Sequence, residues 1–143
     1  MESAPTLTKI VEAVAAANPL QRKRISAFLG QQDPLYFEHA EAICRALVKL
    51  GASQSLGPDD LAAAYNGMLR EMLRLQIDFR RTGSYRESNF GEADQNIYQN
   101  PERMLRYMLG LALSQVLWAN HYKIFRFFGE VVRQSPPPKR YLE

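Results

Sequence analysis

The apolar run from Tyr107 to Ala119 constrains the fold of this chain more than any other feature. It follows Asn100–Glu102, which combines a capping side chain, a proline at the first helical position and an acid at the positive end of the helix dipole. A helix that is apolar on nearly every side is either buried or spans a membrane. This run is shorter than the ~20 residues of a span, and Ser114 and Gln115 interrupt it. We therefore expect a central core helix. Its least accessible residues should include Met108, Leu111, Ala112, Gln115 and Leu117.

A second amphipathic segment is expected after a break at Asn120-His121-Tyr122. Its apolar residues are Ile124, Phe125, Phe127, Phe128, Val131 and Val132. Charged side chains at spacings of three and four predict one solvated stripe along it, made of Lys123, Arg126, Glu130 and Arg133. Pro136 to Pro138 end this segment, because proline cannot continue a helix.

Similar start and stop signals predict the earlier helices. We expect helices over residues 6–17 and 20–29, a third from Asp33-Pro34 to Gly51, and a long one from Pro58 to about Arg81. The spacing of apolar residues predicts which side of each helix faces the core. In the first helix these residues are Leu7, Ile10, Val11 and Val14, and in the third they are Phe37, Ala40, Ile43, Cys44, Leu47 and Leu50. In the long helix they are Leu61, Tyr65, Met68, Met72, Leu75 and Phe79, with Leu69, Leu73 and Ile77 beside them. No segment before Pro136 alternates with period two. The expected fold class is all-α, a compact bundle of about six helices.

Composition and charge limit the number of domains, the class of function and the expected location. The chain has 143 residues, enough for one domain with its own core. A net charge of +3 is too small to indicate nucleic acid, and we ascribe the basic run Arg22–Arg24 to a solvated face. A helix-turn-helix between residues 20 and 50 is the alternative. A single cysteine excludes an internal disulfide, and no apolar leader follows Met1, so the expected location is the cytoplasm, with no membrane partner.

No residues form a self-contained catalytic or metal site. Glu38, His39, Glu41 and Cys44 are close in sequence but lack the spacing of known ligand motifs. Cys44 lies on the apolar face, where a thiol is not activated as a nucleophile. We therefore expect no catalytic residue and no metal ligand in this chain.

Trp118, His121 and Tyr122 at the helix junction are the candidates for a binding site. They either satisfy local backbone groups or line a small-molecule cleft, and the residues alone leave both interpretations open. The irregular segment between Ser84 and Gln99 carries Tyr85 and Tyr98, and it would close over such a cleft as a lid.

The end of the chain resembles a known family. An amphipathic helix, a proline break, the basic pair Lys139-Arg140 and then Tyr141-Leu142-Glu143 resemble the entry to a class I S-adenosylmethionine-dependent methyltransferase domain. The resemblance covers roughly Trp118 to Glu143 and lacks the glycine-rich loop that follows the first strand in that family.

The resemblance implies a helical substrate-capping or dimerisation domain over residues 1–138, and a stub of the first strand over residues 139–143. S-adenosylmethionine and a small-molecule methyl acceptor would bind the longer parent chain, whereas this segment alone should bind no cofactor and be inactive. The resemblance favours the cleft interpretation of Trp118, His121 and Tyr122. The alternative is a free-standing helical module that binds a partner protein or forms a homodimer.

Overall fold

The computed structural model describes residues 5–86, 89–94 and 98–136. Within these residues the chain forms seven helices and no strand, which confirms the all-α bundle. The helices are α1 (Thr6–Ala17), α2 (Pro19–Leu29), α3 (Pro34–Ala52), α4 (Pro58–Thr82), the short α5 (Phe90–Ala93), α6 (Pro101–Leu117) and α7 (Ala119–Gln134). The expected strand stub at residues 139–143 lies outside the described residues.

The predicted start signals cap the helices as expected. The Asp33 carboxylate accepts a hydrogen bond from the Tyr36 amide at 2.8 Å, and the Asn100 side chain accepts one from the Arg103 amide at 3.0 Å. These bonds satisfy amides that have no partner within the first turn of a helix. At the other end of α4, Gly83 takes the left-handed conformation with φ 72°, which glycine adopts without steric cost.

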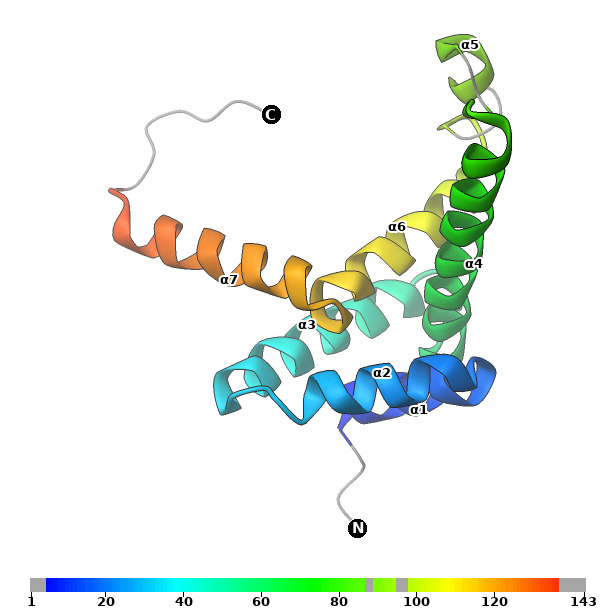
Figure 1. Ribbon diagram of the computed structural model, residues 1–143. Helices are drawn as coiled ribbons and strands as arrows, with labels where there is room; N and C mark the ends of the chain where they lie inside the picture. Colours follow the sequence, from blue (N-terminus) through cyan, green and yellow to red (C-terminus); the bar gives the residue numbers. More distant parts are fainter. Residues whose placement is uncertain (1–4, 87–88, 95–97, 137–143) are drawn as a thin grey trace.

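The core lies where α1, α3, α4 and α6 meet. Helix α4 packs on α1 and α6, while α6 also contacts α3 and α7 (Figure 1). The fully buried apolar side chains at this meeting point include Ile10, Val14, Tyr36, Cys44, Leu61, Leu113 and Val116. Figure 1 shows α7 and the far half of α4 leaving this centre in different directions.

Polar bonds between distant residues hold the helices in register. The buried Tyr36 hydroxyl donates to the Val116 carbonyl at 2.6 Å and so joins α3 to α6. The Glu41 carboxylate on α3 accepts from the amides of Thr6 and Leu7 at 3.0 and 2.9 Å. Glu41 therefore caps the first turn of α1 from another helix.

Helices α4 and α6 lie in close contact at Gly110. A Cβ atom added there would stand 3.0 Å from the Ala64 carbonyl oxygen and 3.0 Å from the Met68 Cβ. Contacts between carbon atoms are favourable at ~3.5–4.0 Å, so a side chain at this position would push the two helices apart.

The prediction that α6 is buried all round is wrong on its outer side. Tyr107 is 45% exposed and Met108 52% exposed. Leu111, Ala112 and Gln115 are half-buried, whereas Leu117 is buried as expected. The buried residues of α6 are instead those between them, such as Leu109 and Leu113. Among the described residues, the side of α6 that carries Tyr107 and Met108 is left open to solvent.

The predicted inward faces of α3 and α4 also extend too far. Phe37 and Leu50 on α3 are exposed, and so are Met72, Leu73, Ile77 and Phe79 on α4. The far half of α4 projects past the α1–α2 pair (Figure 1), and α6 is the main described helix that packs along it. A heptad-like seam is buried only along the length where a neighbouring helix is present.

Candidate functional site

The junction between α6 and α7 is a single extended residue, Trp118. Its φ and ψ are −120° and 125°, its amide donates to the Ser114 carbonyl, and its carbonyl accepts from the Tyr122 amide, both at 3.0 Å. The break predicted at Asn120-His121-Tyr122 is therefore wrong, because those residues form the first turn of α7. The chain turns two residues earlier, which directs the Trp118 indole toward α4.

Trp118 is anchored to the core of the bundle. Its indole Nε1 donates a hydrogen bond to the Tyr65 hydroxyl at 2.8 Å, and Tyr65 is only 1% exposed. Burial raises the pKa of Tyr65, and its hydroxyl oxygen accepts the hydrogen bond from the indole. One edge of the half-buried Trp118 ring is thereby held in place.

His121 packs against Trp118 and bonds to α6. The two ring centres are 4.7 Å apart, and His121 Nδ1 lies 2.8 Å from the Ser114 Oγ. The single hydroxyl hydrogen of Ser114 is donated to the Leu111 carbonyl at 2.6 Å. The Gln115 Nε2 lies 3.4 Å from the same Nδ1, so His121 meets polar groups of both Ser114 and Gln115 on α6. The Trp118–His121 pair is the part of the candidate site that the structure brings together.

Tyr122 turns toward a different neighbour. It is 4% exposed, its ring packs edge-on against Tyr36 at 4.8 Å, and its hydroxyl lies 3.1 Å from His39 Nδ1. Burial raises the pKa of Tyr122. These contacts attach the start of α7 to α3.

Tyr85 and Tyr98 lie at the other end of the molecule. Tyr98 precedes the 17-residue helix α6 and Trp118 follows it, so a rise of ~1.5 Å per residue separates them by about 25 Å. Tyr85 stacks on Phe79 near the end of α4, with ring centres 4.6 Å apart. Tyr98 borders a hollow of about 620 Å³ between α4 and α6. The five candidate side chains therefore do not form one site: Trp118 and His121 pack together, Tyr122 is buried against α3, and Tyr85 and Tyr98 lie at the distal end.

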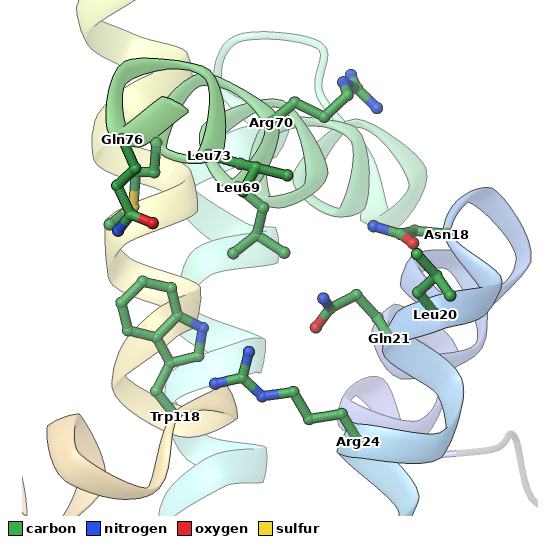
Figure 2. A pocket seen from close by; sticks show the side chains of 10 residues that line it. Asn18, Leu20, Gln21, Arg24, Leu69, Arg70, Leu73, Gln76 and Trp118 are labelled. Carbon is green, nitrogen blue, oxygen red and sulfur yellow. The ribbon is translucent and has the colours of Figure 1, made fainter. Parts of the chain in front are cut away.

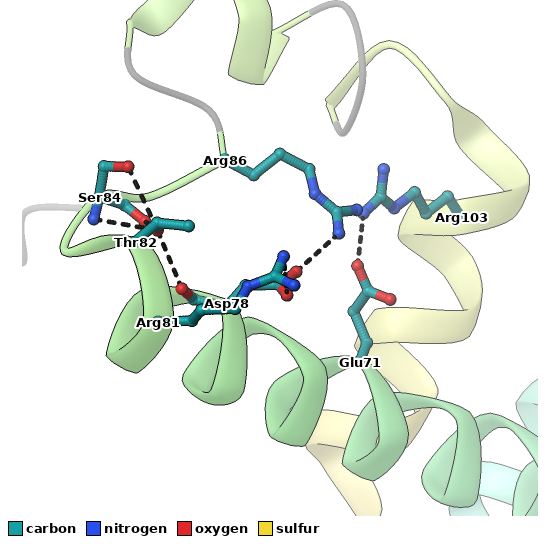
Figure 3. A network of polar contacts seen from close by, with 7 residues as sticks. All are labelled: Glu71, Asp78, Arg81, Thr82, Ser84, Arg86 and Arg103. Carbon is teal, nitrogen blue, oxygen red and sulfur yellow. Dashed lines mark hydrogen bonds and ion pairs between the residues drawn. The ribbon is translucent and has the colours of Figure 1, made fainter.

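Two ion pairs link the distal half of α4 to neighbouring segments. Arg103 pairs with Glu71 and Arg86 pairs with Asp78, each at 3.2 Å (Figure 3). All four side chains are more than one-third exposed, so each pair is worth less than about 1 kcal/mol. The pairs connect α4 with the start of α6 and with the segment after Gly83.

Helix α7 exposes an apolar stripe, which we call the α7 face. It consists of Ile124, Phe127, Phe128, Val131 and Val132, which are between 42% and 67% exposed. The opposite side of the helix contacts α3, where Arg126 pairs with Asp33 at 2.7 Å. That hydrogen bond lowers the pKa of Asp33. Lys123, Glu130 and Arg133 of the charged stripe are exposed as expected, whereas Arg126 contacts the start of α3. The apolar stripe also faces outward, although its spacing is that of a side that packs on a core.

A groove lies between α2 and α4, and we call it the α2–α4 groove. It was not predicted from the sequence. It has a volume of about 430 Å³ and is bordered by Gln21, Arg24, Leu69, Leu73 and Gln76, with Trp118 at one end (Figure 2). Arg24 was assigned to a solvated basic run. The spacing of three between Gln21 and Arg24, which places both on one side of α2, was the available signal.

The described residues provide neither a metal site nor a reactive thiol. No group of three or more histidine, cysteine, aspartate or glutamate side chains in that part of the chain is arranged to hold a metal ion. Cys44 is buried, and burial raises the pKa of its thiol to about 12. A search of the same residues found no helix with the length and apolar character that a membrane span requires.

Comparisons with known proteins add no family to these observations. No protein-family model, curated protein or solved structure matches this chain. The function proposed below therefore rests on the geometry of the chain and on the features of its own sequence.

Proposed function

We propose that this chain is a helical docking unit, and more specifically the substrate-capping or dimerisation region of a class I S-adenosylmethionine-dependent methyltransferase. The α7 face is the observation that carries the proposal. The specific assignment rests on the resemblance of the segment from Trp118 to Glu143 to the entry of a methyltransferase domain, and it stays a prediction.

The size of the α7 face supports a docking role. Phe127 and Phe128 are 67% and 66% exposed, and a phenylalanine buries ~200 Å² when covered. With Ile124, Val131 and Val132 the exposed apolar area is on the order of 500 Å². Soluble monomers rarely expose larger patches than this, and a stable interface needs ~800 Å² from each partner. The α7 face would supply much of one such interface.

In the methyltransferase assignment the covering partner is the catalytic fold or a second copy of the chain. Methyl transfer requires mainly that acceptor and sulfonium are aligned in a site without water, and a helical cap serves that purpose. S-adenosylmethionine and the methyl acceptor would bind the catalytic fold. The chain itself has no glycine-rich loop through which backbone could approach the cofactor.

Calorimetry of the 143-residue chain with S-adenosylmethionine tests the specific assignment. We expect no saturable heat from this chain, and saturable binding when a catalytic fold follows Glu143. Micromolar binding by the 143-residue chain would show that the cofactor site lies elsewhere than we propose.

The docking role is tested by the double substitution Phe127→Ser and Phe128→Ser, with Leu50→Ser as control because Leu50 is 59% exposed on α3. Sedimentation of the chain, alone and with a separately produced catalytic fold, measures association. Self-association that only the double variant abolishes would favour the homodimeric module, and selective binding to the catalytic fold would favour the cap. If neither partner binds, or if the Leu50 variant has the same effect, the docking role is wrong.

A further inference from the structure

We propose that the α2–α4 groove binds a small organic anion, with the acidic group on Arg24 and the apolar body against Trp118 and Leu69. This site is separate from the α7 face and does not depend on the function proposed above.

The charged side chains that border the groove are all positive. Arg24 and Arg70 both border it, and none of the described residues that line it carries a carboxylate. Neither arginine forms an ion pair within the described part of the chain. In Figure 2 the Arg24 guanidinium points across the groove toward Trp118, while Arg70 stands at the opposite rim and points outward. Arg24 is therefore the group positioned to meet an anion inside the groove.

Arg24 also influences the buried groups behind Trp118. Burial raises the pKa of Tyr65, and the hydrogen bond with Trp118 and, to a smaller extent, the positive charge of Arg24 oppose that increase. The Tyr65 hydroxyl holds the indole Nε1 at 2.8 Å, so the Trp118 ring is fixed before any ligand arrives. A fixed ring and a cation on the facing helix make a binding surface that needs little rearrangement.

The rest of the lining suits an apolar body with a few polar contacts. Leu69 and Leu73 project from α4 into the groove, and the amides of Gln21 and Gln76 lie at its sides (Figure 2). A hollow of about 430 Å³ is within the range of small-molecule sites, which are mostly apolar with a few polar groups that orient the ligand. A guanidinium donates hydrogen bonds to the oxygens of a carboxylate or a phosphate monoester, and both groups have the chemistry that we assign to the ligand.

Trp118 is the only tryptophan of the chain, so its fluorescence reports on this groove directly. The probes are octanoate, octyl phosphate, octan-1-ol and acetate, none of which absorbs at the excitation wavelength. We expect saturable changes with one or both octyl anions, and at least tenfold weaker binding of octan-1-ol and of acetate. Comparison of octanoate with octyl phosphate identifies which acid the groove prefers. Equal binding of octan-1-ol, or no saturable change with either octyl anion, overturns the proposal.

Substitutions of arginine by glutamine locate the anion. Arg24→Gln should weaken binding of the octyl anions about five- to tenfold without changing that of octan-1-ol, whereas Arg70→Gln should have a smaller effect. Arg22→Gln removes the same charge from α2 outside the groove and should leave binding unchanged. An equal effect of Arg22→Gln would mean that general positive charge attracts the anion, and the proposed site would be wrong.

A measurement without ligand checks that Arg24 concentrates anions at the ring. Iodide and acrylamide both quench tryptophan, but only iodide is charged. Arg24→Gln should lower quenching of Trp118 by iodide about twofold and leave quenching by acrylamide unchanged. If quenching by acrylamide rises instead, Arg24 packs on the ring as a structural side chain, and the proposal fails.

Discussion

Replacement of Gly110 by alanine should destabilise the protein, whereas the same replacement at Gly129 should stabilise it. Both glycines lie inside helices, Gly110 in α6 and Gly129 in α7. Alanine favours a helix over glycine by ~1 kcal/mol, and this gain applies to both positions. The two sites differ in what the added methyl group meets. Nothing lies within 4 Å of a Cβ at Gly129, whereas a Cβ at Gly110 stands 3.0 Å from the Ala64 carbonyl oxygen and 3.0 Å from the Met68 Cβ.

The size of the difference follows from these contacts. Relief of the clash at Gly110 requires α4 and α6 to separate by about half an ångström, since carbon contacts are favourable at ~3.5–4.0 Å. Overpacking of this kind costs ~1–3 kcal/mol, and the shared gain in helix propensity cancels when the two variants are compared. We expect the free energy of unfolding of Gly110→Ala to lie ~1–3 kcal/mol below that of Gly129→Ala.

Urea unfolding, followed by circular dichroism and by Trp118 fluorescence, measures both variants. With a denaturant slope of ~1–3 kcal/mol per molar, the midpoints should differ by roughly 1 M. Gly67→Ala is a second control, because its Cβ would meet only the flexible end of Arg70, at 3.9 Å. If Gly110→Ala matches these controls, the close approach of α4 and α6 at this residue is refuted.

Further predictions concern side chains whose surroundings the structure defines. Leu117→Ala should cost ~2–5 kcal/mol and Leu111→Ala clearly less, because Leu117 is 4% exposed and Leu111 half-buried; similar losses in urea unfolding would contradict this burial. Burial tends to raise the pKa of the Glu41 carboxyl, but the hydrogen bonds from the Leu7 and Thr6 amides outweigh it and lower the pKa below the ordinary value. The stabilisation it gives is therefore complete above the unfolded pKa and is lost as the pH falls through the folded pKa. Glu41→Gln should cost about 1 kcal/mol at pH 7, and the loss should shrink as the pH falls below the ordinary glutamate pKa of 4.5. A loss that stays constant as the pH falls would count against the cap. Burial raises the pKa of Cys44 to about 12, so a thiol reagent at pH 8 should react only at the rate of unfolding; a rate like that of free cysteine would show that the thiol is accessible.

The starts of the helices could be predicted because capping is local chemistry. Asp33 and Asn100 each satisfy an amide three residues ahead, so the signal and its effect lie within one turn. The absence of period-two alternation likewise excluded a sheet across the described residues. The candidates Trp118 and His121 were found as neighbours for the same reason, since they are close in sequence and pack against each other.

Which side of each helix is buried depends on long-range contacts that apolar spacing does not record. Phe37 was expected in the core, but the neighbouring Tyr36 occupies it, because its hydroxyl reaches the carbonyl of Val116 on another helix. The α7 face has the spacing of a core stripe, yet it lies outward, because Arg126 bonds to Asp33 and Tyr122 packs on Tyr36. The α2–α4 groove likewise exists only where two helices and Trp118 meet. Amphipathic spacing shows that a helix has an apolar side, but packing energy is gained only where another element reaches that side, and tertiary structure alone decides where that happens.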